Sequence, residues 1–276
     1  IFSFAKRFPG EVQCKAYLSQ YKWRNGFTCS KCGHQKEWKG PDQFTKVCAG
    51  CRHVESCTAN TLFHKVKFGL VKAFMIVHEM ATSTKNQSCR VMGRKYDIDK
   101  DTAWLFMQKV RDGMGSATVP LQGKVECAVS SNIPRQKSSK QKGKIKIMAG
   151  VQCLGNGIVK QFAEVQTKGR KLAEIMKERL HSEAIVYSNH LSIRQLIQEE
   201  QEKEQEDKPS LKRIERFTSG LQSWIKGIHH AISRKYSQRY LDEYCFRLNH
   251  HRIKPQLFDL TIQLMVDHPP WFYRKI

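Results

Sequence analysis

Four cysteines in two closely spaced pairs form the pattern in this sequence whose spacing most directly indicates a chemistry. Cys29 and Cys32 are separated by two residues, as are Cys48 and Cys51, and fifteen residues lie between the pairs. Two CxxC turns at this separation can bring four thiolates into a tetrahedron around Zn²⁺. Because a set of four thiolates leaves no coordination position for a substrate, we predict a structural zinc in a zinc ribbon. Two disulfides, or four unrelated core cysteines, are the alternative interpretations.

The remaining cysteines show no comparable spacing and are scattered along the chain: Cys14, Cys57, Cys89, Cys127, Cys153 and Cys245. Such scatter does not suggest a disulfide framework and favours a reducing, cytoplasmic compartment. No apolar run reaches the roughly 18 residues that a membrane span needs, and residues 1–9 are too short and mixed for a signal peptide. We therefore expect no membrane partner.

The net charge indicates a polyanionic partner. The sequence holds 48 Lys and Arg against 25 Asp and Glu, a formal net charge of +23. This excess is too large for an ordinary solvated surface and favours nucleic acid, then an acidic protein, then a membrane surface. For a DNA-binding protein in the cytoplasm, the expected location is the nucleoid.

The residues around the two cysteine pairs combine cations with aromatic rings. This combination on a zinc-held hairpin favours a nucleic-acid surface over a protein-docking one. The expected DNA contacts here are Lys31, Lys36, Lys39 and Lys46, and the neighbouring rings are Trp23, Phe27, His34, Trp38 and Phe44.

Helical periodicity dominates the first part of the chain on both sides of the ribbon. A short amphipathic helix is expected over 11–21, with Val12, Tyr17, Leu18 and Tyr21 on one stripe, and a second over 68–80. Residues 86–93 and 100–114 follow as a helical pair with a tight turn between them, and Asp99 is a natural N-cap for the later helix.

This pair has the pattern of a helix-turn-helix, whose second helix would present polar side chains to DNA. The expected contacts are Lys100, Thr102, Gln108, Lys109 and Arg111, while Trp104 and Leu105 are assigned to the core. Helical hairpins without a role in DNA binding are common, so the pattern alone leaves both interpretations open.

After Pro120 the periodicity changes to that of strands. Expected strands cover 124–129, 144–152 and 157–165, then a helix covers 171–180 and a strand 184–187. Three strands, a helix and a fourth strand form the order of an RNase H-like core, although other α/β domains can produce it. The expected fold is mixed α/β: ribbon, helix-turn-helix, this core and C-terminal helices.

Two charged segments interrupt the core. The basic arm, residues 134–144, lacks apolar side chains and is expected to contact phosphates through Arg135, Lys137, Lys140, Lys142 and Lys144. The acidic insertion, residues 198–208, is expected to be an exposed segment without a site.

Three further helices are expected toward the end of the sequence, over 220–235, 238–249 and 256–266. The first would bury Leu221, Ile225, Ile228 and Ile232. It also carries two adjacent histidines, which point to different faces of a helix and are therefore not expected to share a metal.

Four segments carry a resemblance to a known family. They are Phe8–Trp23, the ribbon Cys29–Cys51, Thr58–His64, and Tyr240–Asn249, which reads Tyr-Leu-Asp-Glu-Tyr-Cys-Phe-Arg-Leu-Asn. With these segments in this order, the chain resembles the bacterial insertion-sequence transposases of the IS1595/ISXO2 group. The resemblance runs essentially end to end.

From the pattern and the resemblance together we expect four regions. Residues 1–63 would hold the N-terminal helix and zinc ribbon, and 64–118 the helix-turn-helix. Residues 119–252 would form the RNase H-like transposase core, and 253–276 a separate C-terminal helix and tail.

The resemblance also implies where three catalytic acids would lie. In the family they hold two divalent metals that activate a water or a 3′-hydroxyl. The first falls in a Val-Glu-x-Asp-Glu pattern, where this sequence has Ala128, and the second ends a Val-Tyr-(Thr/Ser)-Asp pattern, where it has Asn189. The third begins the long helix, at a position near Ser219, and no Asp or Glu occurs between residues 216 and 234.

A working two-metal site is therefore not expected, because two dications need several anionic ligands. Glu126 shares a strand face with Ala128 but is a single carboxylate, and Glu215 is interpreted as lying at the wrong end of the helix to contribute. The leading hypothesis is a catalytically inactive, DNA-binding transposase homologue with structural Zn²⁺ and no Mg²⁺ pair. Its role would be regulatory or architectural, with a homodimer implied by the family.

Two alternatives come from other function classes. One is a basic interaction subunit that docks an acidic protein partner within a larger assembly. The other is an active metal-dependent transposase whose acids are displaced, with Glu126 among them.

Overall fold

The computed structural model describes residues 2–83, 87–117, 119–134, 144–155, 157–167, 169, 171–200 and 211–270. Two compact units make up the chain: unit 1 contains residues 1–116 and 253–276, and unit 2 contains residues 117–252. The boundary of unit 2 differs by two residues from that expected for the core. The C-terminal segment is not a separate region, because it packs within unit 1.

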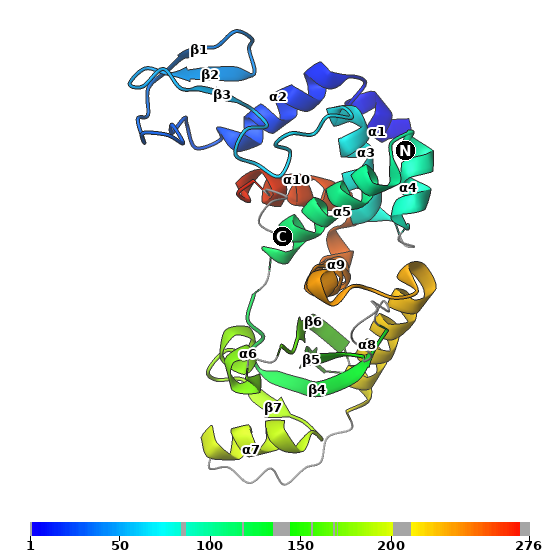
Figure 1. The fold of residues 1–276 in the computed structure, drawn as a ribbon. Helices are drawn as coiled ribbons and strands as arrows, with labels where there is room; N and C mark the ends of the chain where they lie inside the picture. Colours follow the sequence, from blue (N-terminus) through cyan, green and yellow to red (C-terminus); the bar gives the residue numbers. More distant parts are fainter. Residues whose placement is uncertain are drawn as a thin grey trace. The chain divides into compact units, whose positions relative to one another are not determined.

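Unit 1 combines a small antiparallel sheet with a group of helices (Figure 1). Its sheet has the strand order β1-β2-β3. The described elements are α1 (Phe2–Arg7), α2 (Glu11–Lys22), β1 (Glu37–Lys39), β2 (Thr45–Cys48), β3 (Val54–Ser56), α3 (Leu70–Thr82), α4 (Cys89–Tyr96), α5 (Lys100–Gly115) and α10 (Leu257–Asp267).

The core of unit 1 depends on α10, which comes from the far end of the sequence. Phe258 of α10 packs edge-on against Phe4 at 4.7 Å and near Phe8 at 5.5 Å between ring centroids. The backbone carbonyl of Met265 accepts a hydrogen bond of 3.0 Å from the amide of Leu62. At Gly113 of α5, a Cβ would lie 2.8 Å from the Met265 side chain, so glycine permits the close approach of α5 and α10.

The expected stripe on α2 was wrong in one residue. Val12 is 55% exposed, whereas Cys14 and Leu18 are the buried side chains of this helix. The periodicity of α2 is weak because it packs through a narrow strip.

No helix in the described part of the chain is both long and apolar enough to span a membrane.

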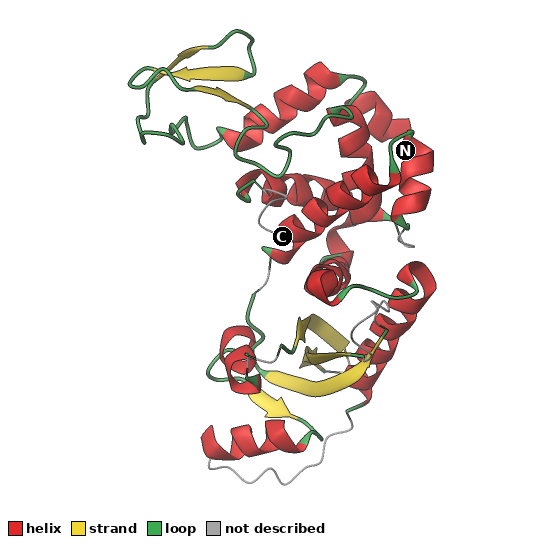
Figure 2. Cartoon of the chain, viewed as in Figure 1, coloured by secondary structure: helices red, strands yellow, loops and turns green. Residues whose placement is uncertain are grey.

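Unit 2 is built on a four-stranded sheet with the order β6-β5-β4-β7 (Figure 2). Strands β4 (Lys124–Ile133), β5 (Ile145–Leu154) and β6 (Gly157–Val165) form an antiparallel meander. Helix α6 (Leu172–Arg179) then crosses the sheet, and β7 (Ile185–Tyr187) pairs parallel to β4 on its other side. This is the topology expected of an RNase H-like core, and the mixed α/β fold class is confirmed.

Helices cover both faces of this sheet. Against one face pack α8 (Lys212–Trp224) and α9 (Ser237–Asn249), in a core that includes Ile147 and Val151. Against the other pack α6 and α7 (Leu191–Glu200), in a core that includes Val125 and Cys127. Alternate residues of each strand therefore serve different helical layers, which accounts for the nearly continuous apolar character of the strands.

Two side chains of α9 occupy the free edge of β6. Asn249 exchanges two 2.9 Å hydrogen bonds with the backbone of Gln161, one as donor and one as acceptor. Gln238 accepts from the amide of Val165 at 2.8 Å and donates to the carbonyl of Ala163 at 3.0 Å. These amides complete backbone pairing that an edge strand would otherwise leave exposed.

The helix expected over 220–235 differs most from the structure. Helix α8 begins at Lys212, because Ile214 and Phe217 extend the buried stripe of Leu221 upstream. It gives way to a π-helical turn, Ile225–His229, and the chain then reverses at His230 with a φ of +56°. A short 3₁₀ turn, Arg234–Tyr236, precedes α9, and another, His251–Gln256, follows it.

Helix α7 was not expected. Its apolar residues Ile193, Leu196 and Ile197 have helical spacing and pack beside the α6 layer. The expected acidic insertion begins in the last turn of this helix, and residues 201–208 of it lie outside the described residues.

Candidate metal centre and nucleic-acid interface

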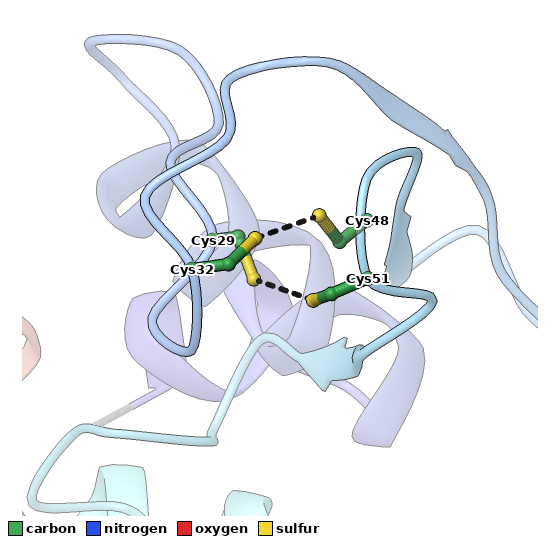
Figure 3. Close-up of side chains that lie close together, drawn as sticks. All are labelled: Cys29, Cys32, Cys48 and Cys51. Carbon is green, nitrogen blue, oxygen red and sulfur yellow. Dashed lines mark hydrogen bonds between the residues drawn. The ribbon is translucent and has the colours of Figure 1, made fainter.

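The four cysteines of the predicted zinc site lie together. All four sulfurs are within 4.8 Å of one another, with Cys29 and Cys51 at 3.6 Å and Cys32 and Cys48 at 3.5 Å (Figure 3). A tetrahedral zinc with Zn–S bonds of about 2.3 Å separates its sulfurs by about 3.8 Å, so the arrangement fits the ion. The chemistry is structural, because four thiolates fill the coordination sphere.

Matching backbone turns position the two cysteine pairs. The amide of Cys29 donates to the carbonyl of His34, and that of Cys48 to His53, each at 2.9 Å. Each turn also contains a residue with positive φ, Gly33 at +75° and Arg52 at +57°. Although burial opposes ionisation, backbone N–H groups of the second turn and the neighbouring thiols lower the pKa of the Cys48 thiol to about 7, whereas, against the effect of the His34 backbone amide, hydrogen bonding to the other cysteines and burial raise the pKa of Cys32.

A buried ion pair connects the ribbon to α2. The ammonium of Lys22 lies 2.7 Å from the Glu55 carboxylate and donates to the carbonyls of Ser56 and Ala59 at 2.7 and 2.6 Å. The second oxygen of Glu55 accepts from the hydroxyl of Ser30, between the first two cysteines, at 2.8 Å. Burial lowers the pKa of Lys22, while Lys22 and Ser30 hold the pKa of Glu55 below its usual value against the effect of burial. We call this the Lys22–Glu55 pair.

Three of the four ribbon lysines expected at DNA are free to contact a ligand. Lys31, Lys36 and Lys39 are exposed and form no ion pair within the described part of the chain. Lys46 differs, because it lies 2.7 Å from Glu37 and 4.7 Å from the centroid of the Trp23 ring. Its charge is therefore used within the ribbon.

Helices α4 and α5 form the expected helical pair. Asp97 takes a left-handed conformation in the turn, and the Asp99 carboxylate accepts from the amides of Asp101 and Thr102 at 2.8 and 3.1 Å, as the sequence predicted. Lys100 and Thr102, both expected at DNA, are exposed at the start of α5.

The expected DNA contacts farther along α5 were wrong. Gln108, Lys109 and Arg111 are 0%, 8% and 1% exposed, and α5 packs against α3 and α10. Lys109 donates to the carbonyl of His64 at 2.8 Å, and burial lowers its pKa to about 8. These side chains hold unit 1 together and do not face a ligand.

Exposed cations lie on α4 instead. Arg90, Arg94 and Lys95 are exposed there, and Lys95 pairs with Glu79. Arg90 and Arg94 are four positions apart and so share a helix face. The sequence analysis missed them, although their i,i+4 spacing was visible.

The structure describes only the terminal residues of the basic arm, at positions 134 and 144. Arg135, Lys137, Lys140 and Lys142 lie outside the described residues, and Lys144 is exposed immediately before β5. The structure therefore gives no position for four of these five expected contacts.

Two of the three positions expected for acids belong to neighbouring strands of the sheet. Ala128 lies within β4, two residues after Glu126, the last β4 residue that pairs with β7, and Asn189 lies two residues after Tyr187, where β7 ends. Ala128 is half-buried beside the α8 layer, and Asn189 is exposed directly after β7. Ser219 is exposed on α8, which packs over β4 and donates from Gln222 to Ser130 at 3.3 Å.

Comparison with family models gives two matches. Residues 119–249 match the ISXO2-like transposase domain, and residues 9–54 match the transposase zinc-ribbon domain. The chain belongs to the IS1595-type transposases. No curated protein and no solved structure gives a significant match to it.

Glu126, one of the buried carboxylates of this transposase core, is engaged within the protein. Glu126 is 2% exposed, and one of its oxygens lies 2.9 Å from the Arg213 guanidinium. Its other oxygen accepts a hydrogen bond from the amide of Ile214 at 3.0 Å, and the sulfur of Cys153 lies 3.5 Å from the oxygen that faces Arg213. Arg213 also donates to the carbonyl of Gly155 at 2.7 Å. Arg213 thus supplies the positive charge that compensates the Glu126 carboxylate.

Glu215 lies at the start of α8. It is exposed in the first turn, one helical turn before Ser219 and therefore on the same side of the helix. The amide of its neighbour Ile214 bonds Glu126, two residues before Ala128 on β4, whereas Gln222 farther along α8 donates to Ser130, two residues after Ala128.

Cys29→Ser is expected to abolish zinc binding and unfold the ribbon. Structural zinc contributes about 10–16 kcal/mol in small zinc domains, far more than the ribbon core supplies. Metal analysis and thermal unfolding measure both effects. Cys89→Ser, outside the tetrad, is the control, and unchanged zinc content in Cys29→Ser would refute the assignment.

Glu55→Gln is expected to destabilise unit 1 by about 3 kcal/mol, because it leaves the buried Lys22 ammonium without its counter-charge. Since the folded-state pKa of Glu55 is depressed, its contribution is complete above the unfolded-state pKa and is lost as pH falls through the folded-state value. Urea unfolding between neutral and acidic pH measures this. The apolar double variant Lys22→Met/Glu55→Leu is expected to lose less stability than Glu55→Gln, and an equal or greater loss would contradict the charge argument.

Proposed function

We propose that this chain binds DNA through unit 1 and neither cuts nor joins DNA strands. The formal charge of +23 supports a polyanionic partner. Lys31, Lys36 and Lys39 on the ribbon supply exposed ammonium groups, and Arg90 and Arg94 supply guanidinium groups on α4. Such groups bind phosphates without reading sequence, which suits a regulatory or architectural protein.

The observation that carries the second half of the proposal is the pair Ala128 and Asn189. Ala128 lies within β4 and Asn189 two residues after the adjacent parallel strand β7, at the positions where the family pattern has two aspartates. Alanine offers no ligand, and an amide offers a dipole where an anion is required. Two metal ions about 4 Å apart repel each other strongly unless several carboxylates surround them.

The remaining carboxylates do not replace this pair. Glu126 is held by Arg213 and the amide of Ile214, so a metal would have to displace an ion pair to reach it. Glu215 is exposed on α8 and is a single anion. The two remaining carboxylates therefore do not form a two-metal site.

A homodimer and a location on the nucleoid belong to this proposal through the family resemblance. If the purified protein fails to bind DNA, an acidic protein partner takes the place of DNA in this proposal.

DNA affinity is expected to fall steeply with salt and to be independent of Mg²⁺. Each phosphate contact contributes about −0.9 to the slope of log K against log salt. The triple variant Lys31→Ala/Lys36→Ala/Lys39→Ala should therefore reduce the slope by nearly three, as measured by fluorescence anisotropy. The matched triple variant of Lys171, Lys177 and Lys212, which are exposed on unit 2, is the control for net charge. Salt-independent binding would contradict the proposal.

The wild-type chain is expected to show no Mg²⁺- or Mn²⁺-dependent nicking or strand transfer on supercoiled DNA. Ala128→Asp/Asn189→Asp restores the two strand carboxylates and tests whether their loss explains the inactivity, since Glu215 remains on α8. Metal-dependent nicking by the wild type that Glu126→Gln or Glu215→Gln abolishes would overturn the proposed inactivity.

A further inference from the structure

The outward face of the ribbon sheet carries a row of apolar side chains. Trp38 of β1 pairs with Val47 of β2, and Val47 pairs with Val54 of β3, so the three side chains lie side by side across the sheet. Trp38 is 55% exposed and Val54 is 53% exposed, while Val47 is half-buried. We call these residues the Trp38 face.

The opposite face of the same sheet is already used. Lys46 extends over the Trp23 ring, and Glu55 joins the Lys22–Glu55 pair. Because successive residues of a strand point to opposite faces, the Trp38 face points away from these contacts. Single exposed apolar side chains are ordinary, but a contiguous row that includes tryptophan marks an interaction surface.

Charge around the Trp38 face identifies the kind of partner. Lys36 and Arg52, which precede Trp38 and Val54 by two residues each, are exposed, and neither of them forms an ion pair among the described residues. The acid nearest in sequence to Trp38, Glu37, is neutralised by Lys46 at 2.7 Å. A flat apolar row beside uncompensated cations suits a ligand that has both rings and negative charges.

We propose that the Trp38 face stacks the unpaired bases of single-stranded DNA, a proposal that rests on DNA binding by unit 1. Base faces are free in a single strand, whereas neighbouring base pairs cover them in a duplex. Exposed aromatic rings on sheets beside cationic grooves bind single strands in this way, with little sequence preference. The ribbon would thus hold unpaired segments, while duplex binding uses phosphate contacts alone.

The test compares a fluorescein-labelled oligothymidylate with a labelled duplex of the same length, each titrated with the full chain. Trp38→Ala is expected to weaken single-strand affinity by about tenfold, within the range for loss of one base–aromatic stack. Trp38→Phe keeps a ring and should retain most of the affinity. Duplex affinity should change less than about twofold in both variants, since phosphate contacts do not involve the ring.

Val12→Ala, which removes a single exposed apolar side chain from α2, is the matched control. Zinc content and thermal unfolding verify that each variant is folded. A folded Trp38→Ala protein with unchanged single-strand affinity overturns this proposal and leaves the proposed function intact. A wild type that binds neither DNA form overturns the proposed function itself. Conversion of a dimer to a monomer by Trp38→Ala, with unchanged single-strand affinity, would assign the face to a second copy of the chain and also overturn the proposal.

Discussion

The ribbon has too little apolar surface to hold three short strands in place, so its shape depends on the bonds that one metal ion forms with four cysteines. Its buried cluster consists of Phe27, Cys29 and Cys48, with Trp23 and Cys51 at the border. The Lys22–Glu55 pair links the ribbon to α2, because Lys22 belongs to α2 and Glu55 contacts Ser30 within the first cysteine turn. The cations and the exposed indole on the outer surface therefore keep their positions only while the metal site is intact.

In the core, the contrast between one buried carboxylate and its neutral neighbours has a direct electrostatic explanation. A buried anion needs a compensating charge, and Glu126 obtains it from Arg213 and from the amide at the start of α8. The expected acid positions hold alanine and asparagine, which carry no charge. The protein's own groups therefore neutralise Glu126 without a metal ion. The same contacts hold α8 against β4. Glu126, which lies close to where the family is expected to bind metal, therefore connects a helix to the sheet in this chain.

Local patterns in the sequence predicted the features that depend on local spacing. The cysteine pairs, strand β6 and the Asp99 cap needed only neighbouring residues. The burial of Gln108, Lys109 and Arg111 was not predictable in this way, because α10, which packs against α5, lies about 150 residues later in the sequence. The start of α8 was missed for a different reason: the stripe was read from Leu221 onward, and Phe217 and Ile214, one and two turns earlier, were not counted.

The return of α10 to the first unit affects the order in which the protein can mature during synthesis. Residues 117–252 are inserted between α5 and α10, so the ribosome completes the whole of unit 2 before it releases the last helix of unit 1. Until then the aromatic side chains that meet Phe258 lack part of their packing, and the amide of Leu62 lacks its carbonyl acceptor. A nascent or truncated chain thus has an incomplete N-terminal unit, which couples the unit proposed to bind DNA to the synthesis of α10.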